Sequence, residues 1–272
     1  MPIYKKSELL PFLQNLGASP KKGLSQNFLI DQNILNNIIS TSGVKQNETV
    51  LEIGPGPGAL TEALLQKGAH VIAVEKDKTL AHALERFSDV EVFCEDILAF
   101  DLKNLPEGKS KIIANLPYHL TTPILAKMLP RRDLFHSLTV MVQEEIAQRI
   151  VAQAKDPNYS SLSIFIRFHA DPIYAFKVSR RCFYPVPAVD SAVVHLKLKE
   201  PPFVTNEKEF FTMCRTAFGQ RRKMLRSSLS SLWPKNQILQ ALGDNETARP
   251  EELSLEELIT LYETLKPLPK TP

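Results

Sequence analysis

The sequence predicts an α/β fold built on a largely parallel, doubly wound sheet, followed by a small all-helical domain. A short apolar strand over residues 49–53 leads into a loop that holds three of the ten glycines, and residues 59–67 have helical periodicity. Two further apolar runs each end in a carboxylate, and strand patterns cease after residue 202. A strand, a glycine loop and a helix in succession are typical of nucleotide-binding sheets.

The composition is that of a globular protein rather than a disordered or membrane-embedded one. Of 272 residues, 43% are hydrophobic and 23% are charged, which suits one large domain and one smaller domain. The sequence has no run of about 18 apolar residues, and its first twenty residues mix charges with short apolar patches. We therefore expect no membrane span, no secretory signal and a cytoplasmic location. The net charge of +3 does not by itself indicate a nucleic-acid partner.

Cysteine and histidine spacing gives no sign of a metal site. Cys94, Cys182 and Cys214 lie far apart in the sequence, without a C-x-x-C pattern, and the six histidines are scattered. Structural zinc sites normally gather such residues at short, regular spacings. The sequence therefore predicts neither a bound metal nor a disulfide.

The amino-terminal residues 1–30 form a basic arm. They carry four lysines against one acid and end in the apolar triplet that begins at Phe28. A frayed terminus is the alternative, but the apolar triplet favours docking of the end of the arm on the domain. Asp31 suits the N-cap of a helix that stops near Gly43.

Two carboxylates follow predicted strands at residues 70–74 and 90–94. Glu75 lies 21 residues after Gly54, where a doubly wound fold places an acid that accepts hydrogen bonds from ribose hydroxyls. Asp96 follows the next strand and could accept a hydrogen bond from the exocyclic amine of adenine. The alternatives are an exposed acid at a strand end for Glu75 and a turn cap for Asp96.

A tetrapeptide after the predicted strand at residues 111–114 favours one chemistry. The Asn115 side-chain oxygen and the Leu116 carbonyl can each accept one N–H of an adenine amine, which directs the nitrogen lone pair toward an electrophilic methyl group. Pro117 fixes the turn, and the Tyr118 ring can stack on the base. The alternative is an ordinary turn in which asparagine and proline have no chemical role.

Six segments occur in one order along most of the chain: residues 26–29, 52–58, Glu75, 95–96, 115–118, and 183–185 with 189–194. In this order they resemble the motifs of the ribosomal RNA small-subunit adenine dimethyltransferases. The resemblance implies a seven-stranded, Rossmann-like class I methyltransferase domain that methylates the N6 amines of two adjacent adenines in the 3′-terminal loop of small-subunit (16S) rRNA. It also implies S-adenosylmethionine as the cofactor, bound by Asn27, Leu29, Gly54, Gly56, Glu75, Asp96 and Asn115.

Other expectations concern residues around these motifs. Phe183 lies in a rigid loop and could stack on the face of a flipped adenine opposite to Tyr118. His119 is expected to be no more than a spectator or packing residue, because the methylated amine is acidic enough to lose its proton to water and no dedicated base is required. Two residues depart from the family pattern. Ser25 replaces a glycine that relatives usually have, and Glu144 stands where a basic residue often follows.

The composition changes near residue 203, so we expect a methyltransferase domain at 1–202 and a helical RNA-recognition domain at 203–272. Before this boundary, residues 161–169 and 188–198 have strand patterns without a helical crossover between them. They fit an antiparallel pair that completes the sheet.

In the second predicted domain, residues 211–229 fit an amphipathic helix that Gly219 can divide in two. At about 100° per residue, three arginines share one face of this helix. A basic face is usually only solvated, but next to a methyl-transfer site it predicts contacts with RNA phosphates. The predicted RNA-binding residues are Arg215, Arg221, Arg222, Lys223 and Arg226.

Three other functions remain open at this stage. A related 23S rRNA adenine methyltransferase of the resistance type shares almost every motif. A nicotinamide-dependent dehydrogenase could use the glycine loop and Glu75, but it gives no role to the tetrapeptide at 115–118. A non-catalytic RNA-binding or ribosome-assembly factor would have a vestigial cofactor site. The expected partner is small-subunit rRNA or a pre-30S particle, and the protein is expected to be monomeric.

Overall fold

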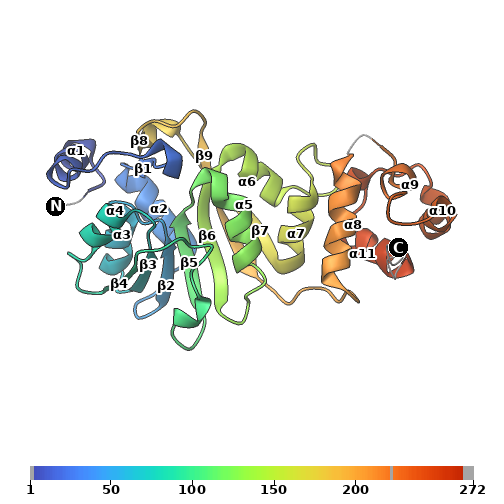
Figure 1. The fold of residues 1–272 in the computed structure, drawn as a ribbon, viewed down its shortest axis with the longest axis horizontal. Helices are drawn as coiled ribbons and strands as arrows, with labels where there is room; N and C mark the ends of the chain where they lie inside the picture. The colour runs from blue at the N-terminus through green and yellow to red at the C-terminus, as the bar shows by residue number, and fades with distance from the viewer. Residues whose placement is uncertain (1–2, 221–222, 266–272) are drawn as a thin grey trace. The chain divides into compact units, whose positions relative to one another are not determined.

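The computed structural model describes residues 3–220 and 223–265 (Figure 1). The chain divides into two compact units. The first unit comprises Met1–Ala147 and Asp171–Lys199, and the second unit comprises Gln148–Ala170 and Glu200–Pro272. The boundary predicted near residue 203 lies close to the crossing at 199–200. The crossings at 147–148 and 170–171 were not predicted from the composition.

A seven-stranded sheet forms the centre of the first unit, in the order β4-β3-β2-β5-β6-β9-β7. Neighbouring strands from β4 to β6 run parallel, whereas β9 is antiparallel to β6. The carboxyl ends of β2, β3, β4 and β5 therefore lie along one edge of the sheet, where ligands of such folds bind. The strands are β2 (Thr49–Ile53), β3 (His70–Val74), β4 (Val90–Phe93), β5 (Ser110–Asn115), β6 (Phe135–Gln143), β7 (Ala170–Val178) and β9 (Ser191–Leu198).

The parallel strands form the apolar core of this unit. Val50, Leu51, Ile112 and Ile113 are all fully buried, as expected for strands that are covered on both faces. The helices of this unit are α1 (Lys6–Asn15), α2 (Gln32–Ser42), α3 (Ala59–Gln66), α4 (Lys78–Leu84) and α5 (Thr121–Met128). Helix α6 (Glu144–Val151) begins in the first unit and ends in the second. The predicted seven-stranded α/β fold is confirmed.

The end of the amino-terminal arm docks on the first unit as the sequence predicted. Two short strands, β1 (Phe28–Leu29) and β8 (Phe183–Tyr184), pair in antiparallel fashion. Asp31 caps α2 by accepting hydrogen bonds from the backbone N–H groups of Asn33 (2.9 Å) and Ile34 (3.2 Å). Gly43 ends the helix with a left-handed conformation, at φ 55°.

The predicted strand at 161–169 is wrong, because this segment is helix α7 (Ser161–His169). The alternating pattern suggested a strand, but Ile164 and Phe168 are spaced by one helical turn and are both fully buried in the core of the second unit. At the start of the helix, the N–H of Ser160 donates to Oγ of Ser163 at 3.0 Å. The strand that lies beside β9 is β7, which follows this helix directly.

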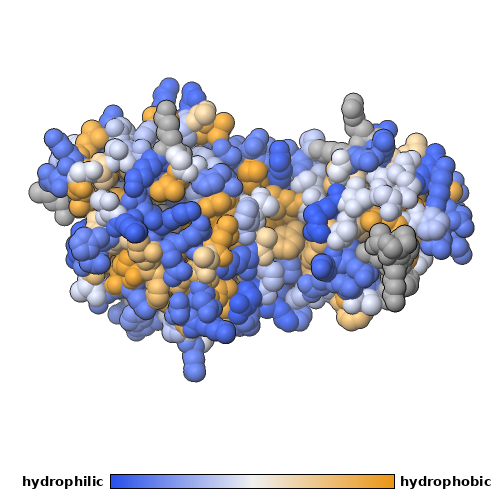
Figure 2. Space-filling model, viewed as in Figure 1, coloured by the Kyte–Doolittle hydropathy of each residue, from blue (hydrophilic) through white to orange (hydrophobic). Residues whose placement is uncertain are grey.

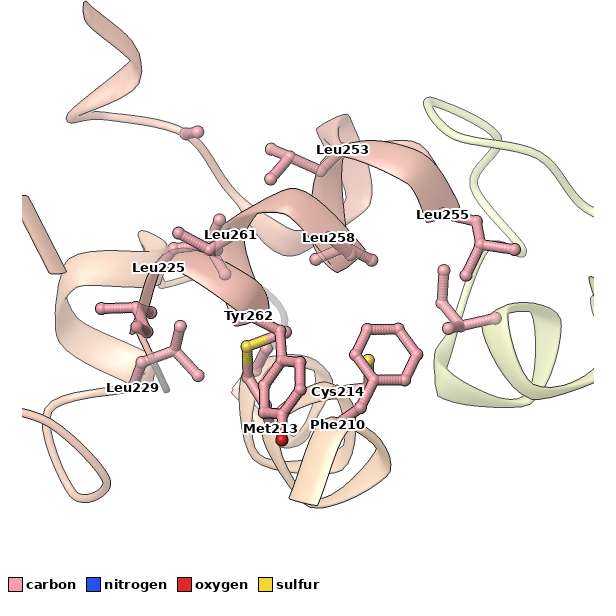
Figure 3. Packing of buried hydrophobic residues seen from close by; sticks show 14 of the residues in the cluster. Phe210, Met213, Cys214, Leu225, Leu229, Leu253, Leu255, Leu258, Leu261 and Tyr262 are labelled. Carbon is pink, nitrogen blue, oxygen red and sulfur yellow. The ribbon is translucent and has the colours of Figure 1, made fainter. Parts of the chain in front are cut away.

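Helices pack around an apolar core in the second unit (Figure 3). Phe210, Met213 and Cys214 of one helix face Leu258 and Tyr262 of another. The core also takes in residues from the segment 148–170, which explains why this segment belongs to the second unit. Besides α7, the helices are α8 (Glu207–Gly219), α9 (Leu225–Ser228), α10 (Lys235–Leu242) and α11 (Leu255–Leu265).

The face seen in Figure 2 carries hydrophilic residues with hydrophobic residues interspersed among them. Among the described residues, no helix combines the length and the apolar character needed to cross a membrane.

Candidate active site

The loop between β2 and α3 depends on its three glycines. Gly54, Gly56 and Gly58 all have positive φ angles, of 65°, 58° and 92°, which side chains with a Cβ rarely adopt. A Cβ on Gly58 would lie 2.8 Å from Cδ2 of Leu84, whereas a Cβ on Gly54 would meet no atom within 4 Å. Gly58 is therefore required for packing, and Gly54 leaves open space beside the backbone.

Glu75 follows β3 and lies against the glycine loop. Its carboxylate accepts the N–H of Gly56 at 2.9 Å on Oε2 and the N–H of Asp77 at 2.8 Å on Oε1. The residue is only 5% exposed, and burial raises the pKa of its carboxyl group. The loop and the acid thus form one rigid unit, because the acid fixes the peptide of the central glycine.

Asp96 follows β4 and has two partners. Its Oδ2 lies 2.9 Å from Nζ of Lys76, and its Oδ1 accepts the N–H of Leu98 at 2.9 Å. The hydrogen bond from Lys76 is the main cause of the lowered pKa of Asp96. The residue therefore does cap a turn, as the alternative interpretation expected, and it presents an ionised carboxylate at the edge of the sheet.

Lys127 of α5 stabilises the loop that carries Asp96. Its Nζ donates to the backbone carbonyls of Ile97 (2.8 Å), Leu98 (3.0 Å) and Phe100 (2.6 Å). The three N–H donors of the ammonium group each bind one carbonyl, so all of its hydrogen-bonding capacity is used. No pattern in the sequence indicates this contact, because the two segments lie about thirty residues apart.

The tetrapeptide 115–118, which begins with the last residue of β5, is held from two sides. Asn115 donates its Nδ2 to the carbonyl of Asn27 at 3.2 Å, which leaves its Oδ1 as the acceptor that the predicted chemistry needs. The hydroxyl of Tyr118 lies 2.8 Å from Oγ of Ser191 in β9. Pro117 has φ −62° and ψ 124° and precedes a short 3₁₀ turn.

We call residues 21–30 of the arm the strap. Ser25 in the strap has φ 52°, a left-handed conformation that costs a non-glycine residue about 1–2 kcal/mol. This angle explains why a glycine was expected at this position. The Ser25 hydroxyl lies 2.9 Å from Nδ1 of His119. His119 therefore has a structural contact with the strap beside the tetrapeptide, and its expected lack of a part in the chemistry stays a prediction.

One cavity brings the predicted residues together at the carboxyl ends of β2 to β5. It is lined by all seven residues expected to bind the cofactor and by the tetrapeptide: Asn27, Leu29, Gly54, Gly56, Glu75, Asp96, Asn115, Leu116, Pro117 and Tyr118. The lining joins the strap, the glycine loop and two strand-end acids, so it combines apolar walls with a few fixed polar groups.

Phe183 does not line this cavity. Its side chain is 1% exposed and belongs to the apolar core together with Leu29 and Leu35. Pairing of β8 with β1 places it opposite Leu29, which explains its burial. The structure therefore does not bring Phe183 to the cavity. Stacking of this ring on a base remains a prediction that requires the ring to leave the core.

Glu52 also lines the cavity, although it was not among the predicted site residues. It is 1% exposed and accepts a hydrogen bond from the Thr61 hydroxyl at 2.7 Å. Burial, aided by the nearby charge of Glu75, raises the pKa of Glu52 to about 8. Two features of the sequence point to it: its position inside the apolar strand at 49–53, and its place at the start of the 52–58 segment that resembles the family motif.

The predicted RNA-binding residues lie in the second unit, apart from Arg221 and Arg222, which lie outside the described residues. Arg215 and Lys223 are exposed, and Arg226 is half-buried. Helix α8 ends at Gly219 and α9 begins at Leu225, so the division that the glycine suggested is confirmed. The prediction that Arg215 and Arg226 share one face of a single helix is therefore wrong, because they lie on different helices.

Comparison with known proteins shows which family has this combination of motifs. Residues 17–266 match the family described as ribosomal RNA adenine dimethylase. The chain belongs to that family. The predicted enzyme class, an S-adenosylmethionine-dependent methyltransferase acting on rRNA adenine, is thereby confirmed.

Named relatives and solved structures agree with this assignment. The chain is 56% identical to the ribosomal RNA small subunit methyltransferase A of Protochlamydia amoebophila, over 97% of this chain and 98% of the relative. It is 48% identical to the protein of that name from Chlamydia muridarum, over 95% and 97%.

Two solved structures resemble the fold over most of the chain. A dimethyladenosine transferase from Plasmodium falciparum has a TM-score of 0.76 and 29% identity, over 86% of this chain and 95% of that one. The 23S rRNA methyltransferase ErmE has a TM-score of 0.67 and 26% identity, over 88% and 99%.

Proposed function

We propose that this protein dimethylates the N6 amines of two adjacent adenines in the 3′-terminal loop of small-subunit rRNA and thereby takes part in small-subunit biogenesis. The observation that carries the proposal is the single cavity in which Asn115 and Tyr118 lie with the glycine loop and Glu75. Relatives that are 47–56% identical carry the name ribosomal RNA small subunit methyltransferase A, which favours this substrate.

The residues of the cavity fit S-adenosylmethionine. Open space beside Gly54 allows close approach of a ligand to the backbone. Glu75 keeps unused lone pairs on both carboxylate oxygens for ribose hydroxyls, and Asp96 offers a carboxylate to an adenine amine. When bound, S-adenosylmethionine supplies an electrophilic methyl group on a positively charged sulfur. Asn27, Leu29, Gly56 and Asn115 complete the proposed binding set.

Asn115 and Leu116 orient the attacking amine of the target adenine. The lone pair of this nitrogen is delocalised into the ring, so the amine attacks poorly unless acceptors reorient it. Oδ1 of Asn115 and the Leu116 carbonyl each accept one N–H, while the Tyr118 ring stacks on the base. The methylated nitrogen is acidic and releases its proton to water, so the site needs no dedicated base.

The target nucleotide has to leave its stack to reach this cavity, which suits an adenine in a loop. The proposed partner is therefore a pre-30S particle or its rRNA, bound by a monomer in the cytoplasm. Basic residues of the second unit, including Arg215 and Lys223, are proposed to hold RNA phosphates.

Labelled S-adenosylmethionine, incubated with particles that lack these methyl groups, tests the substrate. We expect label in small-subunit rRNA and none in large-subunit rRNA, with up to four methyl groups per particle for two dimethylated adenines. The Tyr118→Ala variant is the matched control, because it should retain the cofactor but transfer little label. Since the 23S rRNA methyltransferase ErmE is a structural relative, label confined to large-subunit rRNA would overturn the proposal in favour of that activity.

A further inference from the structure

Asp77 is a buried carboxylate that does not line the cavity and has no part in the proposed methyl transfer. Its side chain is 3% exposed. Oδ2 lies 2.9 Å from Nζ of Lys21 and accepts from Nε2 of Gln26 at 3.0 Å. Oδ1 accepts the N–H of Thr79 at 3.1 Å, which caps α4. One carboxylate thus joins the start of α4 to the strap.

The two strap residues that Asp77 contacts also bind each other. The backbone N–H of Lys21 donates to Oε1 of Gln26 at 2.7 Å. Lys21, Gln26 and Asp77 therefore form a closed set of three contacts, which we call the latch. Gln26 lines the cavity but Lys21 does not, so the latch lies where the strap reaches the cavity.

The rest of the strap is attached elsewhere along the cavity. The carbonyl of Asn27 accepts from Asn115 at 3.2 Å, and the N–H of Ile30 donates to the carbonyl of Cys182 at 2.8 Å. Ser25 contacts His119. The strap is thus tied to the end of β5 and to the segment before β8, and the latch supplies the tie to the segment after β3.

The latch also reaches a residue that is proposed to bind the cofactor. The backbone N–H of Asp77 donates to Oε1 of Glu75 at 2.8 Å. Burial opposes ionisation of Asp77, but the hydrogen bonds from Lys21 and Gln26 outweigh it and lower its pKa. The carboxylate is therefore charged, and it needs the strap to stay paired.

We propose that Asp77 is a positioning residue that holds the strap against the end of β3 and so sets the affinity for S-adenosylmethionine. The inference rests on the proposed function, because it takes this cofactor as the ligand of the cavity. Asp77 acts through Gln26 and Glu75, and the strap brings Asn27 and Leu29 to the cavity wall. Loss of the latch should weaken cofactor binding and leave transfer from the bound cofactor intact.

The test compares Lys21→Met and Lys21→Arg with the wild type by calorimetric titration with S-adenosylmethionine. Lys21 is half-exposed, so neither substitution should prevent folding. We expect Lys21→Met to weaken binding about two- to fivefold, the effect of one partly exposed ion pair, and Lys21→Arg to restore it. The KM for the cofactor should rise by the same factor while kcat is unchanged. Hydrogen exchange in residues 21–30 should quicken in Lys21→Met and slow again when cofactor is added.

Lys111→Met is the matched control. It removes an ion pair of 2.7 Å with Glu48 at the amino end of β5, and neither residue lines the cavity. Cofactor affinity equal to wild type in Lys21→Met, or an equal loss in Lys111→Met, would overturn the role of the latch. Failure of the wild-type protein itself to bind S-adenosylmethionine would instead refute the proposed function.

Discussion

The hydroxyl of Tyr118 lies 2.8 Å from Oγ of Ser191, and this bond joins the tetrapeptide at the end of β5 to the first residue of β9. Ser191 is fully buried, so its hydroxyl has a fixed position. Burial raises the pKa of Tyr118, which keeps its phenol protonated at neutral pH. The bond therefore fixes the ring edge and leaves a ring face available for stacking.

This relationship predicts graded losses in methyl transfer. Tyr118→Ala removes the stacking surface and should lower kcat by about 10- to 100-fold, since base–aromatic stacking contributes roughly 1–3 kcal/mol. Ser191→Ala removes only the bond that orients the ring and should lower kcat by about fivefold. Cofactor affinity, measured by calorimetry, should stay unchanged in both variants. Equal losses of affinity and kcat would refute the stacking role.

The glycine loop predicts two different outcomes for the same substitution. Gly58→Ala should destabilise the protein by about 2–4 kcal/mol, because its Cβ would lie 2.8 Å from Leu84 in addition to the unfavourable φ of 92°. Gly54→Ala meets no neighbour within 4 Å and should cost only about 1 kcal/mol, but it adds a methyl group to the cavity lining. We expect denaturant unfolding to detect mainly Gly58→Ala, and cofactor titration to detect mainly Gly54→Ala.

Lys127 should control the position of the loop that carries Asp96. Lys127→Met leaves three carbonyls without their ammonium donor and should weaken cofactor binding by about tenfold, since hydrogen bonds from charged donors contribute about 1.5–3 kcal/mol. Lys103→Met is the matched control, because it removes an exposed lysine that follows the same loop in the sequence. If both variants bind the cofactor like the wild type, the contacts of Lys127 are only structural.

Glu52 should make stability depend on pH. Burial raises its pKa in the folded protein to about 8 from an ordinary value of 4.5. The folded state therefore holds a proton that the unfolded state has lost, so stability should fall as pH rises from about 4.5 to about 8 and then level off. Glu52→Gln removes this dependence and can still accept the hydrogen bond from Thr61.

The measurement is the Tm of Glu52→Gln and of the wild type across this pH range. The advantage of the variant should grow by several degrees between pH 5 and pH 8, because the pKa difference corresponds to a few kcal/mol. Parallel Tm curves would show that Glu52 is ionised in the folded state.

The features that the sequence predicted correctly share one property, which is that each depends on a few neighbouring residues. The glycine loop, the N-cap Asp31 and the strand-end acids Glu75 and Asp96 follow from local backbone requirements. Their assembly in one cavity follows from the parallel sheet, because carboxyl ends of such strands lie along one edge.

The features that the sequence did not predict depend on contacts between distant segments. The contact of Lys21 with Asp77 and that of Tyr118 with Ser191 each link residues more than fifty positions apart. Phe183 was expected at the site, but pairing of β8 with β1 buries it. Helix α7 was predicted as a strand because its apolar residues occur at every second position. Such a pattern also contains apolar residues four positions apart, which is the spacing of one helical turn.

The basic residues of the second unit give the final prediction. Arg215→Glu combined with Arg226→Glu should weaken binding of small-subunit rRNA and flatten its salt dependence. The slope of log K against log salt should fall by about 0.7 for each single-stranded phosphate contact that is lost. Binding is measured at several salt concentrations by filter retention or fluorescence. Lys235→Glu is the matched control, because Lys235 is an exposed base at the start of α10. An equal effect of Lys235→Glu would mean that the second unit attracts RNA only through its net charge, whereas an unchanged slope in the double variant would mean that Arg215 and Arg226 are merely solvated.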